Sequence, residues 1–562
     1  MRPYGLLFTA LAVPLTASVL AQLPPHQFSL RLGYSATVVM RDMAVDNSGN
    51  IYAVGYFNST IDLDPGVGED LRTTEGLNDI FLVKFSPNGD YLWGRTYGND
   101  QDNLCNAIAY DPLSEAIIIG GTTTDIMDFD GIEVLFSFGI TDAFLYKLGT
   151  DGTPIWANDA GSDANIGEGL SDLVVDNQGS IYYTGYWATS GFPAQVLLMK
   201  CTSGGIAASP NIYGGANTES GSFIALGPDG DLHVVGTFKF RDGSPYDVDF
   251  GSFSFTSGST LDYGNNIFYM RVDAITGTVL NAKIVAHRMD QEGSSGLAVD
   301  ANDMVYISGA YGSSFNGTAA LFGIPVTQVP DNDMNGFVVK LHPSGAASSW
   351  ARVFPNGFSF SRISGMNVDA TGIIHAFGEA IPGVDIDPTT GSVFTTPAGN
   401  FNFLTRLNND GSFHDGFLYN NIITTQVLPQ PNGALILGGN YAASNDFDPG
   451  AGVVSLPSAG GGVPDAFVSK LYDVTMGVSG SHPDDVRIAS NPANDMLTVH
   501  GLQPGSRFTL LDIAGHAVMG DRSIRTMHTI DVSALAPGTY LLRVEGPDGR
   551  LSSQRVVVSS RW

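Results

Sequence analysis

The sequence predicts an all-β fold in two parts, and three observations carry this prediction. The segment DIFLVKFSPNGDYLWGRTYG at Asp79–Gly98 recurs in degraded form about seven times along the chain. Predicted strands in these repeats, such as IYAVGYF and IFLVKF, are apolar on both faces, as in sheets that are covered on both sides. The period ends near Asp484, where a tail with a different pattern of short strands begins.

The first repeat shows the order of elements within one unit. Predicted strands over residues 43–46 and 51–57 are joined by an Asn-Ser-Gly-Asn turn. After a variable connection, predicted strands over 80–85 and 91–97 are joined by a Ser-Pro-Asn-Gly turn. Four antiparallel strands in a repeat of roughly 50 to 75 residues are typical of one blade of a β-propeller.

A glycine near the end of each second strand gives the number of blades as seven, with six or eight as the alternatives because the third and fourth repeats are degenerate. These glycines are Gly55, Gly120, Gly185, Gly236, Gly309, Gly378 and Gly438. Because glycine weakens a strand, its recurrence predicts a close approach of the backbones of neighbouring blades.

The two ends of the array predict how it closes. The last repeat stops after its third strand, 466–471, whereas the segment 28–34 before the first repeat resembles a fourth strand. We expect 28–34 to complete the seventh blade beside 466–471, because this closure removes two open sheet edges. The predicted seven-bladed propeller then occupies residues 22–474 and is closed by the strand 28–34.

Composition limits the partners. With 26 basic and 56 acidic residues, the formal charge of −30 disfavours nucleic acid and anionic membranes as partners. After the N-terminal region, no stretch approaches the ~20 apolar residues of a transmembrane helix. The two cysteines, Cys105 and Cys201, lie in different repeats; a disulfide is chemically permitted after export, but two buried thiols are favoured.

The N-terminal residues predict a signal peptide over residues 1–21. Arg2 supplies the positive charge, an apolar run extends over about 6–20, and Val19-Leu20-Ala21 offers small residues for cleavage. We therefore expect an exported protein whose mature chain begins near Gln22 and carries no lipid anchor, since no cysteine lies at the cleavage point.

The tail, residues 484–562, follows a predicted linker over 475–483. Its predicted short strands, separated by turn signals, indicate a small Ig-like β-sandwich. These strands lie near 486–490, 496–500, 508–512, 529–532, 538–545 and 551–558.

Two family resemblances follow from these motifs. The repeated turn, the Y-x-x-G strand and the D-x-F-x-x-K strand over 28–474 resemble the bacterial beta-propeller repeat family, which implies a fold and no particular activity. In the tail, IASNPAND (488–495), LLDIAGHAV (510–518), DVSALAPGTYLLRV (531–544) and QRVVVS (554–559) resemble the type A C-terminal sorting domain of type IX secretion. Arg555 stands where that family often has Lys.

The second resemblance implies the export route. It implies passage through the Sec system in a member of the Bacteroidota, translocation across the outer membrane by the type IX secretion machinery through 484–562, and a final place at the cell surface or outside the cell. The alternative is a generic Ig-like module, which would carry no such ordered set of motifs.

Paired aspartates in five repeats are the candidate metal ligands. They follow the second strand as Asp62 and Asp64, Asp128 and Asp130, Asp247 and Asp249, Asp385 and Asp387, and Asp446 and Asp448. Alternating carboxylates on an extended segment suit Ca²⁺, which is the one cofactor that the sequence suggests. The competing interpretation, favoured because Ca²⁺ takes six to eight oxygens, is that each pair forms a turn.

A cation recurs at one position of every third strand. The seven residues are Lys84, Lys147, Lys200, Arg271, Lys340, Arg406 and Lys470. They predict either a positive ring for an anionic ligand or, as we favour, ion pairs with aspartates of the same or the next blade, because a buried cation needs a partner. Trp93, Trp156 and Trp350 recur on fourth strands and are predicted to pack between blades, whereas Tyr186 and Trp187 are better candidates for sugar stacking.

No catalytic signature is present: the chain has no HExxH, GxSxG, P-loop or dinucleotide fingerprint. We assign no catalytic residue. The sequence favours a non-enzymatic surface or secreted propeller that binds a glycan or a protein. One alternative is a polysaccharide hydrolase or lyase of the propeller type, because the catalytic carboxylates of such enzymes form no motif that is recognisable in the sequence. Another alternative is a purely structural or adhesive surface protein.

Overall fold

The structure is a computed structural model, in which the chain divides into two compact units, residues 1–472 and 473–562. Within residues 26–558 the described part omits 36, 136–140, 161–165, 190–192, 216–217, 240–246, 257–264, 285–291, 314–318, 327–332, 343–348, 355–360, 381–384, 390–400, 421, 450–452, 459–461, 472–486, 490–495, 501–504, 512–516, 523–526, 537 and 546–550. The predicted signal peptide 1–21 and linker 475–483 lie outside the described residues. In the described residues, no helix has the length and apolar character needed to cross a membrane.

The first unit is built from seven four-stranded antiparallel sheets in the part of the chain that the structure describes. The first four sheets are β2 (Val38–Val45), β3 (Ile51–Phe57), β6 (Asp79–Phe85) and β7 (Tyr91–Tyr97); β8 (Leu104–Asp111), β9 (Ala116–Thr123), β12 (Asp142–Gly149) and β13 (Pro154–Asp159); β14 (Ile166–Val175), β15 (Ile181–Thr189), β16 (Gln195–Cys201) and β17 (Asn211–Tyr213); and β18 (Glu219–Leu226), β19 (Leu232–Lys239), β22 (Asn265–Val272) and β23 (Val279–Ile284).

The remaining three sheets follow the same order. They are β24 (Glu292–Val299), β25 (Val305–Ser313), β28 (Asp333–Leu341) and β29 (Trp350–Phe354); β30 (Ser361–Val368), β31 (Ile374–Ala380), β32 (Phe401–Leu407) and β33 (Phe413–Asn420); and β34 (Ile422–Pro429), β35 (Leu435–Tyr441), β38 (Asp465–Leu471) and β1 (His26–Leu32). Among the described residues, five small hairpins lie between second and third strands: β4 (Thr60–Asp62) with β5 (Leu71–Thr73), β10 (Ile126–Phe129) with β11 (Ile132–Leu135), β20 (Asp247–Phe250) with β21 (Phe253–Thr256), β26 (Ala319–Leu321) with β27 (Ile324–Val326), and β36 (Asn445–Asp446) with β37 (Ser455–Leu456).

The seventh sheet joins the two ends of the repeat array. β1 pairs antiparallel with β38, and the register places Leu30 opposite Val468 and Leu32 opposite Ala466. The expected pairing of the N-terminal segment with 466–471 is therefore present, although the strand covers 26–32 rather than 28–34. Arg31 adds an ion pair with the buried Asp465 of β38, at 3.2 Å from Nε to Oδ2.

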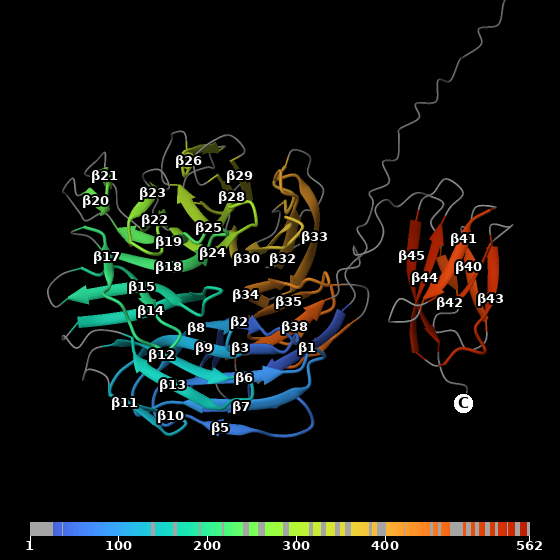
Figure 1. Cartoon of the computed structure of the whole chain (residues 1–562), viewed down its shortest axis with the longest axis horizontal. Coiled ribbons are helices and arrows are strands. Elements are labelled where there is room, and N and C mark those ends of the chain that lie inside the picture. The colour runs from blue at the N-terminus through green and yellow to red at the C-terminus, as the bar shows by residue number, and fades with distance from the viewer. Residues whose placement is uncertain are drawn as a thin grey trace, which may run out of the picture. The chain divides into compact units, whose positions relative to one another are not determined.

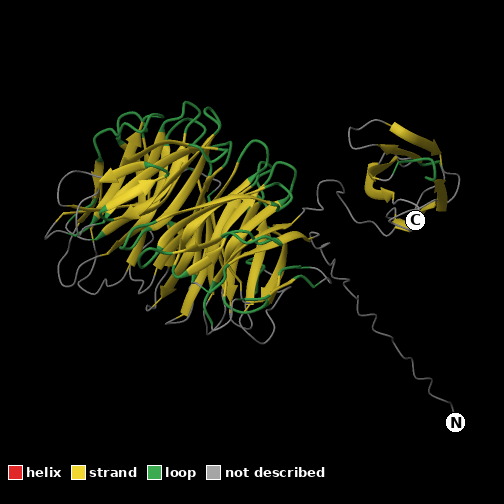
Figure 2. Ribbon diagram, turned by 90° about the horizontal axis from the view of Figure 1, so that it is seen from below, coloured by secondary structure: helices red, strands yellow, loops and turns green. Residues whose placement is uncertain are grey.

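The seven sheets form a closed ring, and Figures 1 and 2 show them packed side by side. The first strands of successive sheets contact one another from β2 through β8, β14, β18, β24 and β30 to β34, and β34 contacts β2. A separate hydrophobic cluster fills each of the seven junctions between neighbouring sheets. Apolar residues on both faces of the strands are explained by this packing, because each sheet buries both faces against its neighbours.

Every first strand carries a β-bulge, which places one unpaired residue in the strand. The glycine that recurs in the second strand lies opposite the bulge. A Cβ at Gly121 would lie 1.9 Å from the carbonyl oxygen of Leu104 in the same sheet, and one at Gly439 would lie 1.9 Å from that of Ile423. Glycine is required because the two backbones of one sheet approach closely at the bulge.

This observation corrects the sequence analysis in two respects. The close backbone approach is within a sheet, not between neighbouring sheets. In the second and seventh sheets the glycine opposite the bulge is Gly121 and Gly439, so the expected Gly120 and Gly438 are each displaced by one residue.

The second unit consists of two antiparallel sheets. One contains β39 (Arg487–Ala489), β40 (Met496–His500) and β43 (Met527–Asp531); the other contains β42 (Ala517–Arg522), β41 (Arg507–Leu511), β44 (Gly538–Glu545) and β45 (Leu551–Val558). A single cluster that includes Val499, Leu510 and Val556 joins residues of both sheets. The predicted strands are all present, and β42 is a further strand that the sequence analysis did not identify.

Candidate functional site

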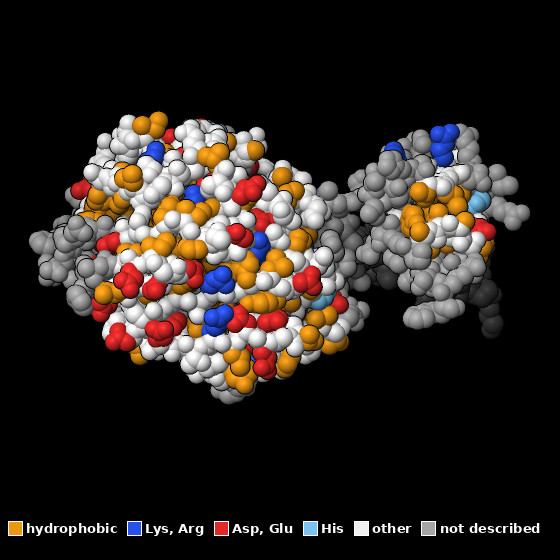
Figure 3. All heavy atoms as spheres, turned by 60° about the horizontal axis from the view of Figure 1, so that its bottom comes forward, with side chains coloured by type: hydrophobic (Ala, Val, Ile, Leu, Met, Phe, Trp, Pro, Cys, Tyr) orange, Lys and Arg blue, Asp and Glu red, His pale blue; other side chains and the backbone are white. Residues whose placement is uncertain are grey.

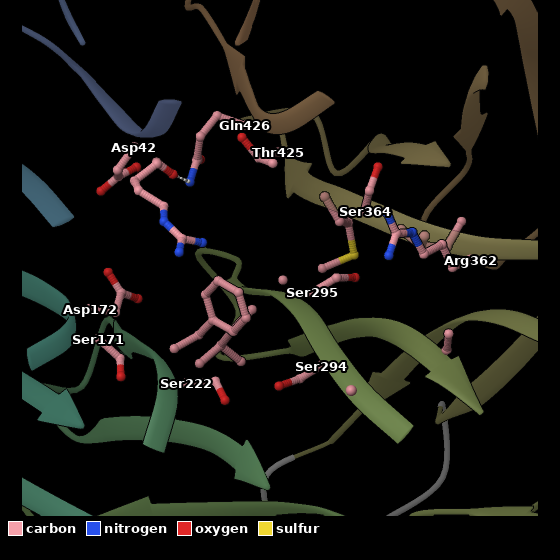
Figure 4. A pocket seen from close by; sticks show the side chains of 18 of the residues that line it. Asp42, Ser171, Asp172, Ser222, Ser294, Ser295, Arg362, Ser364, Thr425 and Gln426 are labelled. Atoms are coloured by element: carbon pink, nitrogen blue, oxygen red, sulfur yellow. Dashed lines mark hydrogen bonds between the residues drawn. The ribbon is translucent and has the colours of Figure 1, made fainter. Parts of the chain in front are cut away.

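A cavity of about 890 Å³ lies where the first strands of the seven sheets meet. Each of the strands β2, β8, β14, β18, β24, β30 and β34 contributes residues to its wall. Figure 4 shows side chains from separate strands, among them Asp42, Asp172, Ser294 and Arg362, around the same open space. We call this cavity the central channel.

The bulged residue of every first strand lines the central channel. These residues are Arg41, Asn106, Ser171, Ser222, Ser295, Ser364 and Thr425. A bulge re-aims its side chain away from the regular pleat. The ring geometry therefore presents seven polar side chains to one cavity, and most of them are hydroxyls.

Polar side chains at the channel wall also join neighbouring sheets. Asn106 donates from Nδ2 to the carbonyl of Leu170 in the next sheet at 2.8 Å. Gln426 of the seventh sheet donates to the carbonyl of Arg41 in the first sheet at 3.3 Å, which is the dashed line in Figure 4. The channel wall thus contributes to ring closure as well as to the cavity.

Asp42 and Asp172 are the two carboxylates of the channel wall. Oδ2 of Asp42 accepts the amide of Ile108 and Oδ2 of Asp172 accepts the amide of Ile224, each at 2.9 Å and each in the next sheet. Burial raises the pKa of Asp172 to about 7. Burial and the charge of Asp172 together raise the pKa of Asp42 well above its usual range.

Two guanidinium groups, those of Arg41 and Arg362, face the same cavity. Arg362 forms an ion pair with Glu379 at 2.7 Å. Arg41 is exposed, lies over the ring of Tyr56 at 5.3 Å, and has no ion pair among the described residues. The cavity therefore has as many cations as carboxylates in its wall, whereas the outer face in Figure 3 carries more acidic than basic side chains.

The repeated cations lie far along the strands from this cavity, beside the hairpin turns, and do not line it. Four of them pair with aspartates, as favoured: Lys84 with Asp46 at 3.8 Å, Lys147 with Asp111 at 2.8 Å, Arg271 with Asp231 at 2.8 Å, and Arg406 with Asp415. None of these partners belongs to the five aspartate pairs.

A second interaction of the cations links successive sheets. Lys84, Lys340 and Lys470 donate to the carbonyls of Thr150, Asn409 and Pro87, each in a hairpin turn of the next sheet, at 2.6, 3.1 and 2.7 Å. Lys84, Lys200 and Lys340 also lie over a tyrosine ring in the neighbouring strand of the same sheet, at 5.0 to 5.5 Å. The contacts of these cations are therefore with neighbouring strands of the same sheet or with the next sheet, and they do not form an open positive ring.

The repeated tryptophans pack between sheets, as predicted. Trp156 and Trp350 each donate from Nε1 to a turn carbonyl of the next sheet at 3.1 Å, and a Cβ at Gly411 would lie 2.8 Å from the Trp350 ring. Tyr186 and Trp187 do not line the central channel.

The aspartate pairs anchor the connections that contain them. In all five pairs, the residue between the two aspartates is buried. These residues are Leu63, Phe129, Val248, Ile386 and Phe447. Described carboxylates of these pairs accept hydrogen bonds from nearby groups, for example Asp62 from the amides of Asp64 and Asp70, and Asp446 from those of Asp448 and Val454. The Asp247 side chain lies outside the described residues.

These contacts favour the turn interpretation of the pairs. Among the described residues, three potential metal ligands converge only at Asp229, His233 and Asp303, and none of these belongs to a pair. Ca²⁺ binding by the pairs stays a prediction.

The sequence analysis missed the channel residues. Four of the seven bulged residues are serine, so a serine that recurs in the first strands was the available signal, but only the register shift shows that these residues lie in a bulge. Both cysteines are buried free thiols, in agreement with the favoured interpretation.

Comparison with known proteins identifies the tail. The family model of the secretion system C-terminal sorting domain matches residues 488–559. A search of curated proteins finds no match to the chain.

Solved structures give only weak similarities. PorZ, a surface component of the type-IX secretion system of Porphyromonas gingivalis, has 12% identity and a TM-score of 0.23, with 92% of this chain and 75% of that chain covered. Puromycin hydrolase has 11% identity and a TM-score of 0.34, with 73% and 59% covered. Prolyl oligopeptidase B from Galerina marginata has 10% identity and a TM-score of 0.36, with 83% and 56% covered. At these TM-scores the likenesses identify no activity.

The sorting-domain match agrees with the motifs at 488–495, 510–518, 531–544 and 554–559, and it covers both sheets of the second unit. Residues 488–559 are therefore a secretion system C-terminal sorting domain, and the chain is exported by type IX secretion to the cell surface or beyond it.

Proposed function

We propose that this chain is an exported seven-bladed β-propeller without enzymatic activity, which binds an acidic glycan in its central channel. The observation that carries the proposal is the ring of bulged side chains, which brings five hydroxyls, an amide and a guanidinium into one cavity of about 890 Å³. A cavity of this size accommodates a small-molecule ligand or a short oligosaccharide.

The side chains of the channel suit a ligand rich in hydroxyl groups. Serine, threonine, asparagine and glutamine offer both donors and acceptors, as sugar hydroxyls do. Phe223 is the aromatic residue in the wall and supplies an apolar face for a sugar ring.

Arg41 supplies the preference for an acidic ligand. It is exposed to the channel and has no carboxylate partner among the described residues, so a carboxylate or sulfate of the ligand would complete its interactions. The chain as a whole carries a formal charge of −30. In so acidic a chain, an arginine in the central cavity that has no carboxylate partner among the described residues indicates an acidic ligand.

A glycan array probed with the purified chain tests the proposal. We expect binding to glycans that carry carboxylate or sulfate groups, and at least a tenfold loss of affinity in Arg41→Ala. Arg72→Ala is the control, because it also removes one arginine but at a site outside the channel, where Arg72 pairs with Asp70. Binding that is unchanged in Arg41→Ala would exclude the channel as the site. A parallel array with a chelator tests Ca²⁺ at the aspartate pairs.

One observation favours a second function, hydrolysis of a polysaccharide. Asp42 and Asp172 both face the channel, and glycosidases use a pair of carboxyl groups, of which the general acid has a raised pKa, as both have here. However, both oxygens of each carboxyl group accept backbone amides: Oδ1 accepts the amide of the next residue, and Oδ2 accepts an amide of the next sheet and so holds the two sheets together. Release of reducing sugar from a bound glycan, abolished in Asp172→Asn with binding retained, would establish the enzyme.

A further inference from the structure

The first hairpin turn of most sheets follows one design. An aspartate at its start caps the turn by accepting amides, and its second oxygen bonds the second residue of the next strand. Asp46 accepts from Tyr52 at 3.0 Å, Asp300 from Tyr306 at 3.0 Å, and Asp369 bonds His375 Nε2 at 3.0 Å. In the sixth sheet, the imidazole thus has a carboxylate of its own turn.

The fourth sheet breaks this design. Gly227 occupies the position of the capping aspartate, while the imidazole is kept as His233. His233 Nδ1 shares a hydrogen bond with the Tyr269 hydroxyl at 2.9 Å, but Nε2 has no hydrogen-bond partner although the side chain is 0% exposed.

The adjoining turn of the fifth sheet keeps its capping aspartate, Asp300, but differs from the other turns at another position. Asp303 has a φ of 62°, at the turn position where five other sheets have a glycine with positive φ: Gly49, Gly179, Gly230, Gly372 and Gly433. A non-glycine residue is strained in this conformation. Asp303 nevertheless directs Oδ1 to within 3.3 Å of His233 Nε2, and this buried oxygen has no hydrogen-bond partner.

The two departures create a cradle beside Gly227. Asp229, His233 and Asp303 each offer one ligand atom, and these three atoms lie within 4.8 Å of one another. A Cβ at Gly227 would lie 2.8 Å from Asp229 Oδ1, 2.9 Å from Asp303 Oδ1 and 2.9 Å from His233 Nε2. The ligand atoms therefore surround a space that any residue other than glycine would fill.

Charge at this cradle is out of balance. Arg271 pairs with Asp229, with Asp231 at 2.8 Å and with Asp303 Oδ2 at 3.6 Å, so one cation faces three carboxylates. Arg271 contacts the Oδ2 atoms, which leaves Oδ1 of Asp229 and Asp303 toward the imidazole.

We propose that Asp229, His233 and Asp303 bind one divalent transition-metal ion, with Zn²⁺ as the expected ion, at the junction of the fourth and fifth sheets. Imidazole nitrogen with two carboxylate oxygens is a donor set of Zn²⁺, whereas Ca²⁺ takes oxygen ligands alone. A bound dication offsets the surplus of two negative charges and occupies the lone pair of Nε2 when Nδ1 donates to Tyr269. The ion would join two neighbouring sheets.

Titration calorimetry of the chelator-treated full chain with Zn²⁺, Mn²⁺ and Ca²⁺ tests this site. We expect one high-affinity Zn²⁺ equivalent, weaker Mn²⁺ binding and no Ca²⁺ equivalent at this position. Asp303→Gly restores the glycine of the other turns, so it should fold at least as stably without metal and bind Zn²⁺ at least tenfold more weakly.

His233→Gln and His375→Gln form a matched pair, because both histidines are buried at equivalent positions but only His233 lies at the cradle. His233→Gln should lose the Zn²⁺ equivalent and His375→Gln should keep it. Absence of Zn²⁺ binding in the unsubstituted chain, or equal binding in folded Asp303→Gly, would overturn the proposal. Binding of Ca²⁺ instead of Zn²⁺ would overturn the choice of metal.

Discussion

The hairpin turns and the central channel differ in what the sevenfold repeat preserves. Near the turns, the residue type is repeated: a cation occupies the same place in all seven third strands and contacts a neighbouring strand of its own sheet or a turn of the next sheet. At the channel, the geometry is repeated in every sheet but the residue type only in part: each first strand has a bulge, and the bulged residue is Ser in four sheets and Arg, Asn or Thr in the other three. The repeated cations stabilise the ring, whereas the bulged residues, which share a position but not all a residue type, are available to bind a ligand.

The largest loss of stability is expected from substitution of a glycine opposite a β-bulge, where the backbone geometry is repeated in every sheet. Gly121→Ala places a Cβ 1.9 Å from the backbone carbonyl of Leu104, and should lower the free energy of unfolding by about 4 kcal/mol or more. At the adjacent Gly120, the nearest atom to an added Cβ is a Leu170 side-chain carbon at 2.7 Å, which can move. Urea unfolding of both variants compares them, and an equal loss would show that the bulge does not require the glycine.

A smaller effect is expected from the repeated cations. Lys147→Met leaves the buried carboxylate of Asp111 without its cation and should cost about 3 kcal/mol. Lys200 lies over the Tyr182 ring and has no carboxylate partner among the described residues, so Lys200→Met should cost less, about 1 kcal/mol. Thermal unfolding measures the difference. The comparison fails if the two variants are equally stable.

The channel carboxylates predict a dependence on pH. Asp172 has a pKa of about 7 in the folded chain against its usual 3.8, so the folded state binds more protons between these values. Its contribution to stability therefore falls as pH rises from about 4 to about 7, by at most about 1.4 kcal/mol per pH unit, and is level above that range. Asp172→Asn should make this slope shallower, because the raised pKa of Asp42 still contributes, and unfolding measured at several pH values checks it. A slope as steep in the variant as in the unsubstituted chain would assign it to other groups.

The smallest effect on stability is expected from the channel hydroxyls. Ser171→Ala with Ser222→Ala should change the free energy of unfolding by no more than about 0.5 kcal/mol for each substitution, because both side chains face the cavity. Urea unfolding and glycan binding, measured on the same sample, separate the two roles. A large loss of stability would place these serines among the structural residues of the ring.

Much of the molecule was predictable because the same strand and turn motifs recur in successive repeats, so that each repeat supports the interpretation of the others. The order of strands, the closing strand near 28–34, the packing role of Trp156 and Trp350, and the sorting domain all followed from motifs in the sequence. The aspartate pairs were harder to interpret. Their turn contacts agree with the favoured interpretation, but the buried residue between each pair, such as Leu63, was not identified as the anchor.

The sequence by itself determined the all-β repeat and the export route, because alternating strand and turn signals and the ordered tail motifs are local properties of the chain. Only the tertiary structure decided which residues share a cavity. Arg41 and Thr425 are far apart in sequence and unlike in chemistry, and they meet because ring closure brings the bulges of the first and seventh sheets to one channel. The cradle at Gly227, His233 and Asp303 arises in the same way, since two departures from the repeat come together only when neighbouring sheets pack.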